Sequence, residues 1–274
     1  MKIAFIGGGN MASALIAGLA GTLTAGANIH VADPNADALA RLHAQFGVTT
    51  APAADAAVAA ADVIVLAVKP QSMRDVAAQL APLLAAQHGR QPLLLSIAAG
   101  IRAADLSRWL GGYGAIVRCM PNTPSLIGMG IAGLVAAGGV TPAQRDAADA
   151  IMRAVGATVW LDDEAQIDPV TALSGSGPAY VFYFIEAMEQ AAVEMGLDAA
   201  QGKQLALATF AGAAQLAAQS DEAVSVLRER VTSKGGTTYA ALTSMEHSGV
   251  KAAIVTAVKA ACARGKQMGD ELGG

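Results

Sequence analysis

A glycine pattern near the N-terminus has the residue types and spacing of a phosphate-binding turn. The apolar run Ile3 to Ile6 leads into Gly7-x-Gly9-x-x-Ala12, and helix-forming residues follow. A strand, a glycine turn and a helix in this order typically bind a dinucleotide, although an ordinary strand–helix turn of another α/β protein is the alternative. The helix N-terminus would hold the pyrophosphate of NADPH or NADH. The predicted contact residues are Gly7, Gly8, Gly9, Asn10, Met11 and Ala12.

An aspartate follows the second predicted strand, in Ala32-Asp33-Pro34. It lies about 20 residues after Ala12, where a carboxylate accepts hydrogen bonds from the adenosine ribose. Taken alone, a carboxylate here would repel a 2′-phosphate and favour NADH over NADPH. An equally good interpretation is that Asp33 caps the helix that opens at Pro34.

Two further strand ends carry residues suited to the same crevice, because ligands of parallel sheets lie at the carboxyl ends of the strands. The first is Ala67-Val68-Lys69-Pro70, where Lys69 faces the crevice or is simply a solvated surface lysine. The second is Ala98-Ala99-Gly100, whose small side chains would let a nicotinamide ring lie against the backbone.

The strand that ends near Met120 leads into a loop with two prolines, Pro121 and Pro124. This rigid loop could carry Asn122 into the crevice. Arg118, near the end of the strand, is interpreted as a structural ion-pair partner or backbone anchor rather than a catalytic group.

A run of small and hydroxyl residues, Thr232 to Thr238, precedes a predicted helix in the second half of the chain. Hydroxyls and bare backbone N–H groups at a helix N-terminus can bind a carboxylate. An ordinary Ser/Thr helix cap is the alternative.

Acid–base and metal-binding residues are sparse. Two distant cysteines, Cys119 and Cys262, indicate neither a disulfide framework nor a metal site. The histidines have no metal spacing and no partner acid nearby, so we interpret them as surface or packing residues: His30, His43, His88 and His247. Dehydrogenases that move a hydroxyl proton need a His or Lys, so this pattern points away from them.

Alternating elements in the first half would position these residues. The predicted strands are Ile3–Ile6, Asn28–Ala32, Val63–Val68, Leu93–Ser96, Ala115–Met120, Gly130–Ala136 and Thr158–Leu161. The predicted helices between the early strands are Met11–Gly21, Ala36–Phe46, Ser72–Leu84 and Arg102–Leu110. This alternation predicts a doubly wound parallel α/β sheet of the Rossmann type.

The second half shows only helical periodicity. We expect a dinucleotide-binding domain over residues 1–163 and an all-α domain over 164–274. Its predicted helices are Pro169–Met195, interrupted near Ser174–Pro178, and Ala199–Ser220, Asp221–Arg230, Thr238–His247 and Val250–Met268. Some are apolar almost all round and must be covered on every side, which predicts a subunit interface.

Composition limits the function classes. The chain is 54% hydrophobic and 15% charged, with a net charge of −4, so we expect no nucleic-acid partner. The first apolar run is too short for a secretory signal, and prolines and glycines break the other uncharged stretches. We expect no membrane association and a cytoplasmic location.

Five motifs, in order along nearly the whole chain, resemble those of the Δ1-pyrroline-5-carboxylate reductase family, whose members catalyse the last step of proline biosynthesis. They are Ile6-Gly-Gly-Gly-Asn10-Met-Ala, Ala67-Val-Lys-Pro-Gln71, Met120-Pro-Asn-Thr-Pro124, Thr171-Ala-Leu-Ser-Gly-Ser-Gly-Pro-Ala-Tyr180 and Val231-Thr-Ser-Lys-Gly-Gly-Thr-Thr238.

The resemblance implies reduction of the imine of pyrroline-5-carboxylate to L-proline by hydride transfer from NAD(P)H. It also implies an intertwined homodimer, often assembled into a decamer. The substrate would contact Ser233, Gly236, Thr237 and Thr238, with Thr238 bonded to the ring nitrogen, and Glu164 would lie near it. Because protonation of the imine can come from solvent, no catalytic histidine is needed.

The sequence departs from the family in two places. Lys234 replaces the usual proline of the Ser-Pro-Gly-Gly loop, which removes rigidity and adds a charge near an anionic substrate. Asp33 stands where the family often places Ser or an Asn-Arg pair to bind the 2′-phosphate of NADPH, so the cofactor preference stays open.

Two rival functions are weaker. A β-hydroxyacid dehydrogenase needs a lysine on a long helix of the second domain, and no lysine lies between Asp168 and Gly202. A non-enzymatic dinucleotide sensor would not need the 232–238 loop.

Overall fold

A computed structural model describes residues 1–87 and 89–273. The chain divides into two units, an N-terminal unit of residues 1–176 with 260–274 and a helical unit of residues 177–259. Each is described by itself. The interpretation of His88 lies outside the described residues.

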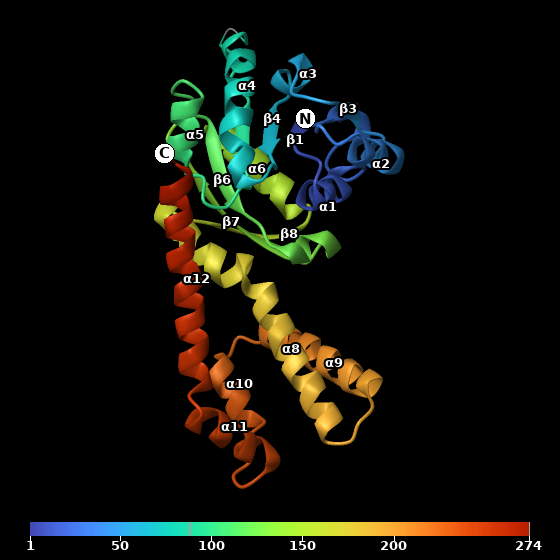
Figure 1. The fold of residues 1–274 in the computed structure, drawn as a ribbon, viewed down its shortest axis with the longest axis vertical. Helices are drawn as coiled ribbons and strands as arrows, with labels where there is room; N and C mark the ends of the chain where they lie inside the picture. The colour runs from blue at the N-terminus through green and yellow to red at the C-terminus, as the bar shows by residue number, and fades with distance from the viewer. Residues whose placement is uncertain (88, 274) are drawn as a thin grey trace. The chain divides into compact units, whose positions relative to one another are not determined.

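An eight-stranded sheet forms the centre of the N-terminal unit (Figure 1), in the order β3-β2-β1-β4-β5-β6-β7-β8. The strands are β1 (Ile3–Ile6), β2 (Ile29–Ala32), β3 (Thr49–Ala51), β4 (Val63–Leu66), β5 (Leu93–Ser96), β6 (Ile116–Met120), β7 (Gly130–Ala136) and β8 (Gly156–Trp160). The sequence predicted all of these except β3, whose three residues are too few to show a pattern.

The sheet is parallel except between β6 and β7, which are antiparallel. The prediction of a parallel sheet was wrong at this pair. The connecting residues 121–129 contain only a short 3₁₀ turn, Thr123–Ile127. A parallel connection needs a crossover of about a dozen residues or more, so this short link turns the chain back.

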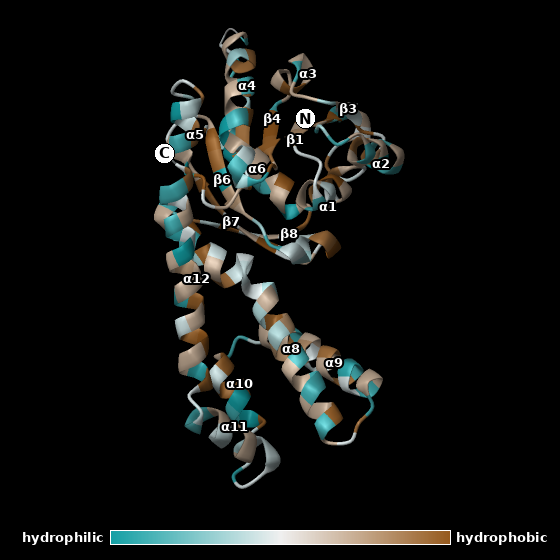
Figure 2. Cartoon of the chain, viewed as in Figure 1, coloured by the Kyte–Doolittle hydropathy of each residue, from teal (hydrophilic) through white to brown (hydrophobic). Residues whose placement is uncertain are grey.

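Helices cover both faces of the sheet. Phe5 of β1 packs in a core with α1 (Asn10–Leu19), α2 (Ala36–Phe46) and α6 (Pro142–Arg153). Its neighbour Ala4 faces the other core, under α3 (Ala56–Ala59), α4 (Met73–Ala85) and α5 (Ala103–Trp109). Successive strand residues point to opposite faces, so strands covered on both sides are apolar throughout, as Figure 2 shows for β4.

Two helices, α3 and α6, were not predicted from the sequence. In α6 only Ala148, Ile151 and Met152 are buried, so its apolar stripe is narrow. It begins at a capping box between Thr141 and Gln144. The helix α3 has four residues, too few for helical periodicity.

The predicted interruption of the long helix is confirmed. The helix α7 (Ile167–Val170) widens into a π-helical turn at Thr171–Gly175, and α8 (Gly177–Glu194) follows. The Ser176 N–H donates to the Thr171 carbonyl at 2.8 Å, the spacing of a π-helix. Pro178 then lies in the first turn of α8, where its missing N–H is not needed.

The helical unit contains α8 together with α9 (Ala199–Ala218), α10 (Val224–Arg230) and α11 (Thr237–His247). The helix α12 (Val250–Leu272) begins in this unit and ends in the N-terminal unit. The Phe184 and Phe210 rings lie 6.5 Å apart and join α8 to α9.

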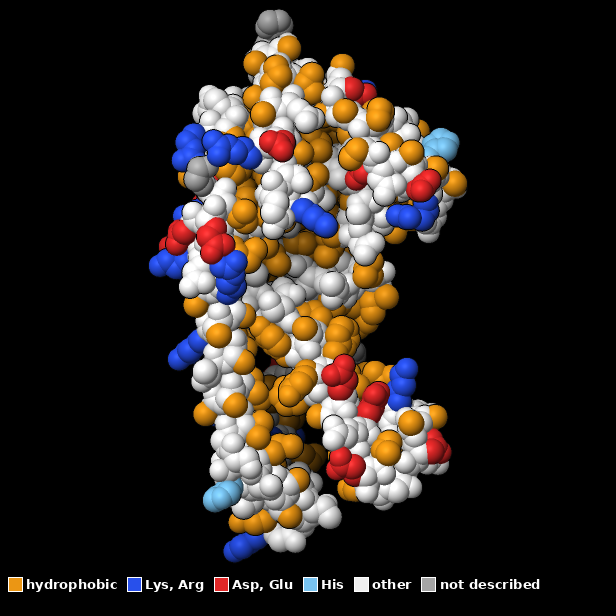
Figure 3. Space-filling view, in the orientation of Figure 1, with side chains coloured by type: hydrophobic (Ala, Val, Ile, Leu, Met, Phe, Trp, Pro, Cys, Tyr) orange, Lys and Arg blue, Asp and Glu red, His pale blue; other side chains and the backbone are white. Residues whose placement is uncertain are grey.

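Large apolar side chains remain uncovered on the single chain in the helical unit (Figure 3). Tyr183 is 72% exposed, Met195 77% and Leu216 60%. Large apolar side chains left exposed in this number favour a subunit interface. None of the described helices has the length and apolar character that a bilayer span requires.

Candidate active site

The glycine turn after β1 is built as a phosphate-binding turn requires. Gly7 has φ of +103°, and a Cβ on it would lie 2.5 Å from the Ala67 carbonyl oxygen. Its N–H donates to the Ala32 carbonyl at 2.9 Å, which joins the turn to the end of β2. Glycine is therefore required here by both conformation and space.

Gly9 is different, because a Cβ on it would have no neighbour within 4 Å. It is the N-cap of α1, has an extended backbone and makes no side-chain cap. The first N–H groups of α1, from Asn10 to Ala12, have no acceptor among the described residues. The turn therefore presents free donors and the positive end of a helix to open space, the arrangement that suits a pyrophosphate.

A cleft of about 600 Å³ lies beside this turn, within the N-terminal unit. Its lining includes several predicted cofactor residues, namely Gly7, Gly9, Asp33, Pro34, Ala67, Val68 and Lys69. Clefts of this size accommodate small ligands and cofactors. The glycine cradle, the free N–H groups and the cleft together fit a dinucleotide.

Other cofactor residues in the prediction lie outside this lining. Gly8 is bonded to Asp33, Ala12 is buried in the core, and Pro70 opens the 3₁₀ turn Pro70–Ser72. Ala98 is buried, and Ala99 is partly exposed beside it. Gly100 lines a second cavity. The assignment of these residues, and of Asn10 and Met11, to the cofactor stays a prediction.

Part of the cleft wall could not be predicted from the sequence. Pro52, Ala53 and Ala54 follow β3. Ser72 ends the 3₁₀ turn before α4, and Asp75, Val76 and Gln79 come from α4 itself. Proline and alanine side chains carry no chemical signal, and β3 itself was not predicted. Only the topology, which places β3 beside β2, brings these residues to the cleft.

Asp33 holds the glycine turn and the start of α2 together. One carboxylate oxygen accepts the Gly8 N–H at 2.6 Å, and the other accepts the Asn35 N–H at 2.7 Å. The alternative interpretation of Asp33 as the helix cap was wrong, because the Asn35 side chain caps α2 by accepting the Ala38 N–H. The helix begins two residues later than that interpretation assumed.

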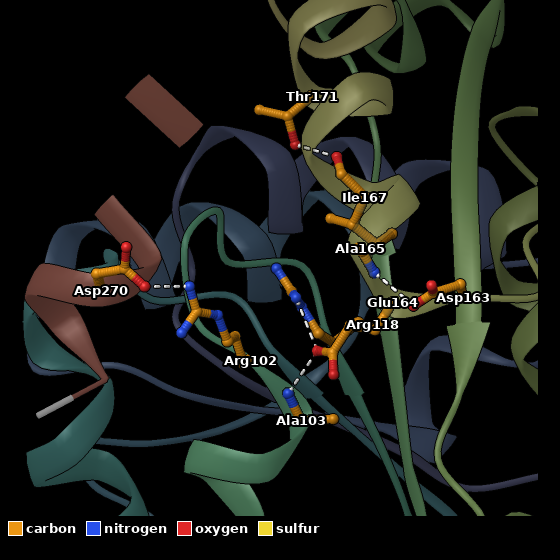
Figure 4. A network of polar contacts seen from close by, with 9 residues as sticks. All are labelled: Arg102, Ala103, Arg118, Asp163, Glu164, Ala165, Ile167, Thr171 and Asp270. Carbon is orange, nitrogen blue, oxygen red and sulfur yellow. Dashed lines mark hydrogen bonds and ion pairs between the residues drawn. The ribbon is translucent and has the colours of Figure 1, made fainter. Parts of the chain in front are cut away.

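Glu164 lies in a polar network of the N-terminal unit (Figure 4). A single carboxylate oxygen accepts from Arg118 and from the Ala103 N–H, each at 2.7 Å. Arg118 is 5% exposed, and its pairing confirms the structural role expected from the sequence. The carboxylate thus ties β6 to the N-terminus of α5.

The second cavity, about 520 Å³, surrounds this network. Arg102, Asp168, Lys266 and Gly100 share its lining with Glu164 and Arg118. Arg102 pairs with Asp270 at 2.5 Å, and that contact raises the pKa of the guanidinium. Glu164 therefore lines a cavity separate from the dinucleotide cleft.

The 232–238 loop leads into an uncapped helix N-terminus in the helical unit. Gly235 has φ of +75°, and the Gly236 N–H donates to the Ser233 carbonyl at 3.0 Å. The helix α11 starts at Thr237 with no side-chain cap on Gly236, so the alternative of an ordinary cap was wrong. In the described part of the chain, the N–H groups of Thr237, Thr238 and Tyr239 have no acceptor.

These three N–H groups lie at the positive end of an eleven-residue helix that begins with two threonines. Ser233 and Thr237 are exposed and Thr238 is partly exposed, so an anion can reach them. The arrangement suits a carboxylate.

The described residues offer neither a reactive Cys119 thiolate nor a cluster of metal ligands. Burial raises the pKa of the Cys119 thiol far above its ordinary value, so it stays protonated. No group of three His, Cys, Asp or Glu side chains that could hold a metal ion occurs within residues 1–87 and 89–273.

Comparisons with known proteins identify the family of the chain. Residues 164–268 match the family profile described as "Pyrroline-5-carboxylate reductase dimerisation", and residues 2–100 match "NADP oxidoreductase coenzyme F420-dependent". A pyrroline-5-carboxylate reductase of Pseudomonas aeruginosa is 46% identical over 272 residues, covering 99% of this chain and 98% of that protein.

Solved structures extend the match. A pyrroline-5-carboxylate reductase from Coxiella burnetii has a TM-score of 0.90 at 38% identity, covering 97% of this chain and 98% of that one. A pyrroline carboxylate reductase from Plasmodium falciparum, solved with NADP bound, has a TM-score of 0.86 at 31% identity and covers 98% of each chain.

Proposed function

The chain belongs to the pyrroline-5-carboxylate reductase family, and from this premise we propose how its own residues carry out the reaction. The enzyme reduces the C=N bond of pyrroline-5-carboxylate to give L-proline, the last step of proline biosynthesis. When bound, NAD(P)H supplies the hydride that adds to the imine carbon. The observation that carries the proposal is the uncapped helix N-terminus at Thr237 in a chain that also has a dinucleotide turn.

The glycine turn and its cleft hold the cofactor. The N–H groups of Gly9 to Ala12 bind the pyrophosphate, while Asp33 and Pro34 lie at the adenosine ribose. Ala67, Val68 and Lys69 line another wall of the cleft, and Pro70 follows them. Ala98, Ala99 and Gly100 support the nicotinamide. The open space at Gly9 and the cleft lining support the roles of the glycine turn and of the residues from Asp33 to Lys69.

The loop before α11 binds the substrate. Its carboxylate accepts hydrogen bonds from the free N–H groups of Thr237 and Thr238, and from the Ser233 hydroxyl beside Gly236. The Thr238 hydroxyl orients the ring nitrogen. The bare N–H groups support this role, because a helix N-terminus stabilises a negative charge.

Glu164 lies near the substrate in the prediction from the family resemblance, and we retain it as a proposed substrate-binding residue. One of its oxygens is occupied by Arg118 and the Ala103 N–H, while the other has no partner among the described residues. That second oxygen is the one available to a ligand.

The chemistry needs alignment more than acid–base catalysis. An imine becomes a good hydride acceptor once its nitrogen is protonated, and solvent can supply that proton near neutral pH. The protein contributes by fixing the substrate carboxylate and the ring nitrogen. This explains why Thr238 suffices where another dehydrogenase would use a histidine.

The assembly is a homodimer, since residues 164–268 match a dimerisation domain. We propose that residues 1–163 bind the cofactor and residues 164–274 bind the substrate and the second subunit, with higher assembly to a decamer in the cytoplasm. The two matched profiles, at 2–100 and 164–268, support this division.

A spectrophotometric assay tests the proposal. Purified dimer should oxidise NADH or NADPH only when pyrroline-5-carboxylate is present, and should reduce NAD(P)⁺ with L-proline at high pH. A dinucleotide sensor would bind cofactor without turnover, and that result would refute the proposed function.

A further inference from the structure

We propose that Asp33 makes NADH, rather than NADPH, the preferred reductant of this enzyme. The inference rests on the reductase function proposed above and concerns the specificity of its cofactor cleft. From the sequence alone, Asp33 could either contact the ribose or cap the following helix.

The carboxylate is fixed at the cleft by the backbone on both sides of it. The Gly8 and Asn35 N–H groups, at 2.6 and 2.7 Å, take one acceptor position on each oxygen. A carboxylate has about four acceptor positions, so each oxygen can still accept one more hydrogen bond. Two neighbouring ribose hydroxyls can supply these two donors, whereas a 2′-phosphate supplies none and adds negative charge.

The walls around Asp33 offer nothing that would neutralise such a phosphate. Its neighbours in the cleft lining are Pro34, Pro52, Ala53 and Ala54, which have no side-chain donor. Within this lining, Asp33 is therefore the sole side chain at the ends of β2 and β3 that can make a polar contact.

The one basic side chain among the residues lining the cleft is Lys69, and it follows β4. In the sheet order β4 is separated from β2 by β1, which corresponds to roughly 10 Å between the two strand ends. A second acid, Asp75, also lines the cleft. The nearest basic residue along α2, Arg41, is exposed and does not line the cleft.

A 2′-phosphate would thus approach a fixed carboxylate with no cation beside it. The repulsion between such charges near a protein surface corresponds to a preference of about 10- to 100-fold in affinity. We expect kcat/KM for NADH to exceed that for NADPH by this factor in the wild-type dimer.

The test combines kinetics with binding. The ratio of kcat/KM for NADH to that for NADPH is measured in the wild type, in Asp33→Ser and in Asp37→Asn. Asp37 is exposed on the first turn of α2 and does not line the cleft. The Asp37→Asn substitution therefore removes the same charge as Asp33→Ser and serves as its control. Asp33→Ser should shrink the ratio by about tenfold or more, and Asp37→Asn should leave it near the wild-type value.

Calorimetric titration of the wild type with ADP-ribose and with its 2′-phosphorylated form gives a readout that needs neither turnover nor a variant. Tighter binding of ADP-ribose supports the proposal, and equal or weaker binding overturns it. A wild-type preference for NADPH also overturns it, as does an unchanged ratio in a folded Asp33→Ser protein. If pyrroline-5-carboxylate is not reduced with either cofactor, the proposed function fails while the titration still decides the role of Asp33.

Discussion

The glycines of the N-terminal turn differ in why a side chain is absent: Gly7 is needed for the fold, and Gly9 for the proposed phosphate contact. Gly7 is needed by the protein itself, because its positive φ and the Ala67 carbonyl leave no room for a Cβ. Gly9 has room for a side chain in the protein and an ordinary φ of −73°. Its lack of a side chain matters only when a phosphate approaches the backbone.

This difference predicts opposite phenotypes for two alanine variants. Gly7→Ala should lower the free energy of unfolding by about 1–3 kcal/mol, because the backbone must shift. Gly9→Ala should keep the thermal stability of the wild type and weaken NAD(P)H binding by about tenfold or more. Thermal unfolding and cofactor titration check both, and a Gly9→Ala protein with wild-type affinity would contradict the phosphate contact.

At the substrate loop, Thr238 is expected to act through its hydroxyl. Thr238→Ala should lose about 10- to 100-fold in kcat with unchanged dinucleotide affinity. Thr238→Ser keeps the hydroxyl and should retain most of the activity. Steady-state kinetics with pyrroline-5-carboxylate make the comparison, and full turnover in Thr238→Ala would remove this residue from the mechanism.

At the scale of elements, the Asp149 carboxylate links α6 to the edge strand β8. Asp149 accepts hydrogen bonds from Thr158 at 2.7 Å and Trp160 at 3.0 Å, and pairs with Arg153. The Arg145 guanidinium stacks 3.9 Å from the centre of the Trp160 ring on the same strand. Burial opposes ionisation of Asp149, but the hydrogen bonds from Arg153, Thr158 and Trp160 outweigh it and lower its pKa.

A pH dependence of stability follows from this lowered pKa. The folded pKa lies below the unfolded value of about 3.9, so the stabilisation is present above about pH 4 and is lost as the pH falls through the folded pKa. Asp149→Asn should therefore lower the melting temperature near neutral pH, and the difference from wild type should shrink towards about pH 3. A difference that stays constant across this range would show that the ionised carboxylate does not stabilise the fold.

The elements that could be predicted from the sequence are those with strong local patterns. The apolar strands β1 and β5 and the helix α2 have the predicted bounds, because burial on both faces and a clear cap mark them. The antiparallel turn after β6 depended on loop length, and β3 was too short to detect. At the site, the sequence predicted the glycine turn at Gly7 and a helix start at Thr238, one residue after the observed start at Thr237, because turns and helix starts favour particular residue types. Ala53 and Ala54 reach the cleft only through the tertiary fold.

At the scale of the whole molecule, the helical half is incomplete as a single chain. Phe182 of α8 is 59% exposed and Leu205 of α9 is 57% exposed, although both are large apolar residues. Burying such a side chain stabilises an assembly by about 1.5–3 kcal/mol. The homodimer explains why the chain carries so much uncovered apolar surface.

Charged variants of this surface should weaken the dimer. Phe182→Glu and Leu205→Glu should each raise the dimer dissociation constant by about tenfold or more, since a buried unpaired charge replaces an apolar contact. Lys203→Glu, an exposed polar position on α9, is the matched control. Light scattering over a dilution series measures the dimer dissociation constant. If both single variants dimerise as the wild type does, the interface lies elsewhere.

The most direct measurement is a crystal structure of the dimer soaked with L-proline and oxidised cofactor. The account predicts the proline carboxylate within hydrogen-bond distance of the Thr237 and Thr238 N–H groups, and the cofactor pyrophosphate at the turn of Gly7 to Gly9. Proline bound away from residues 233–238, with the cofactor in place, would contradict it.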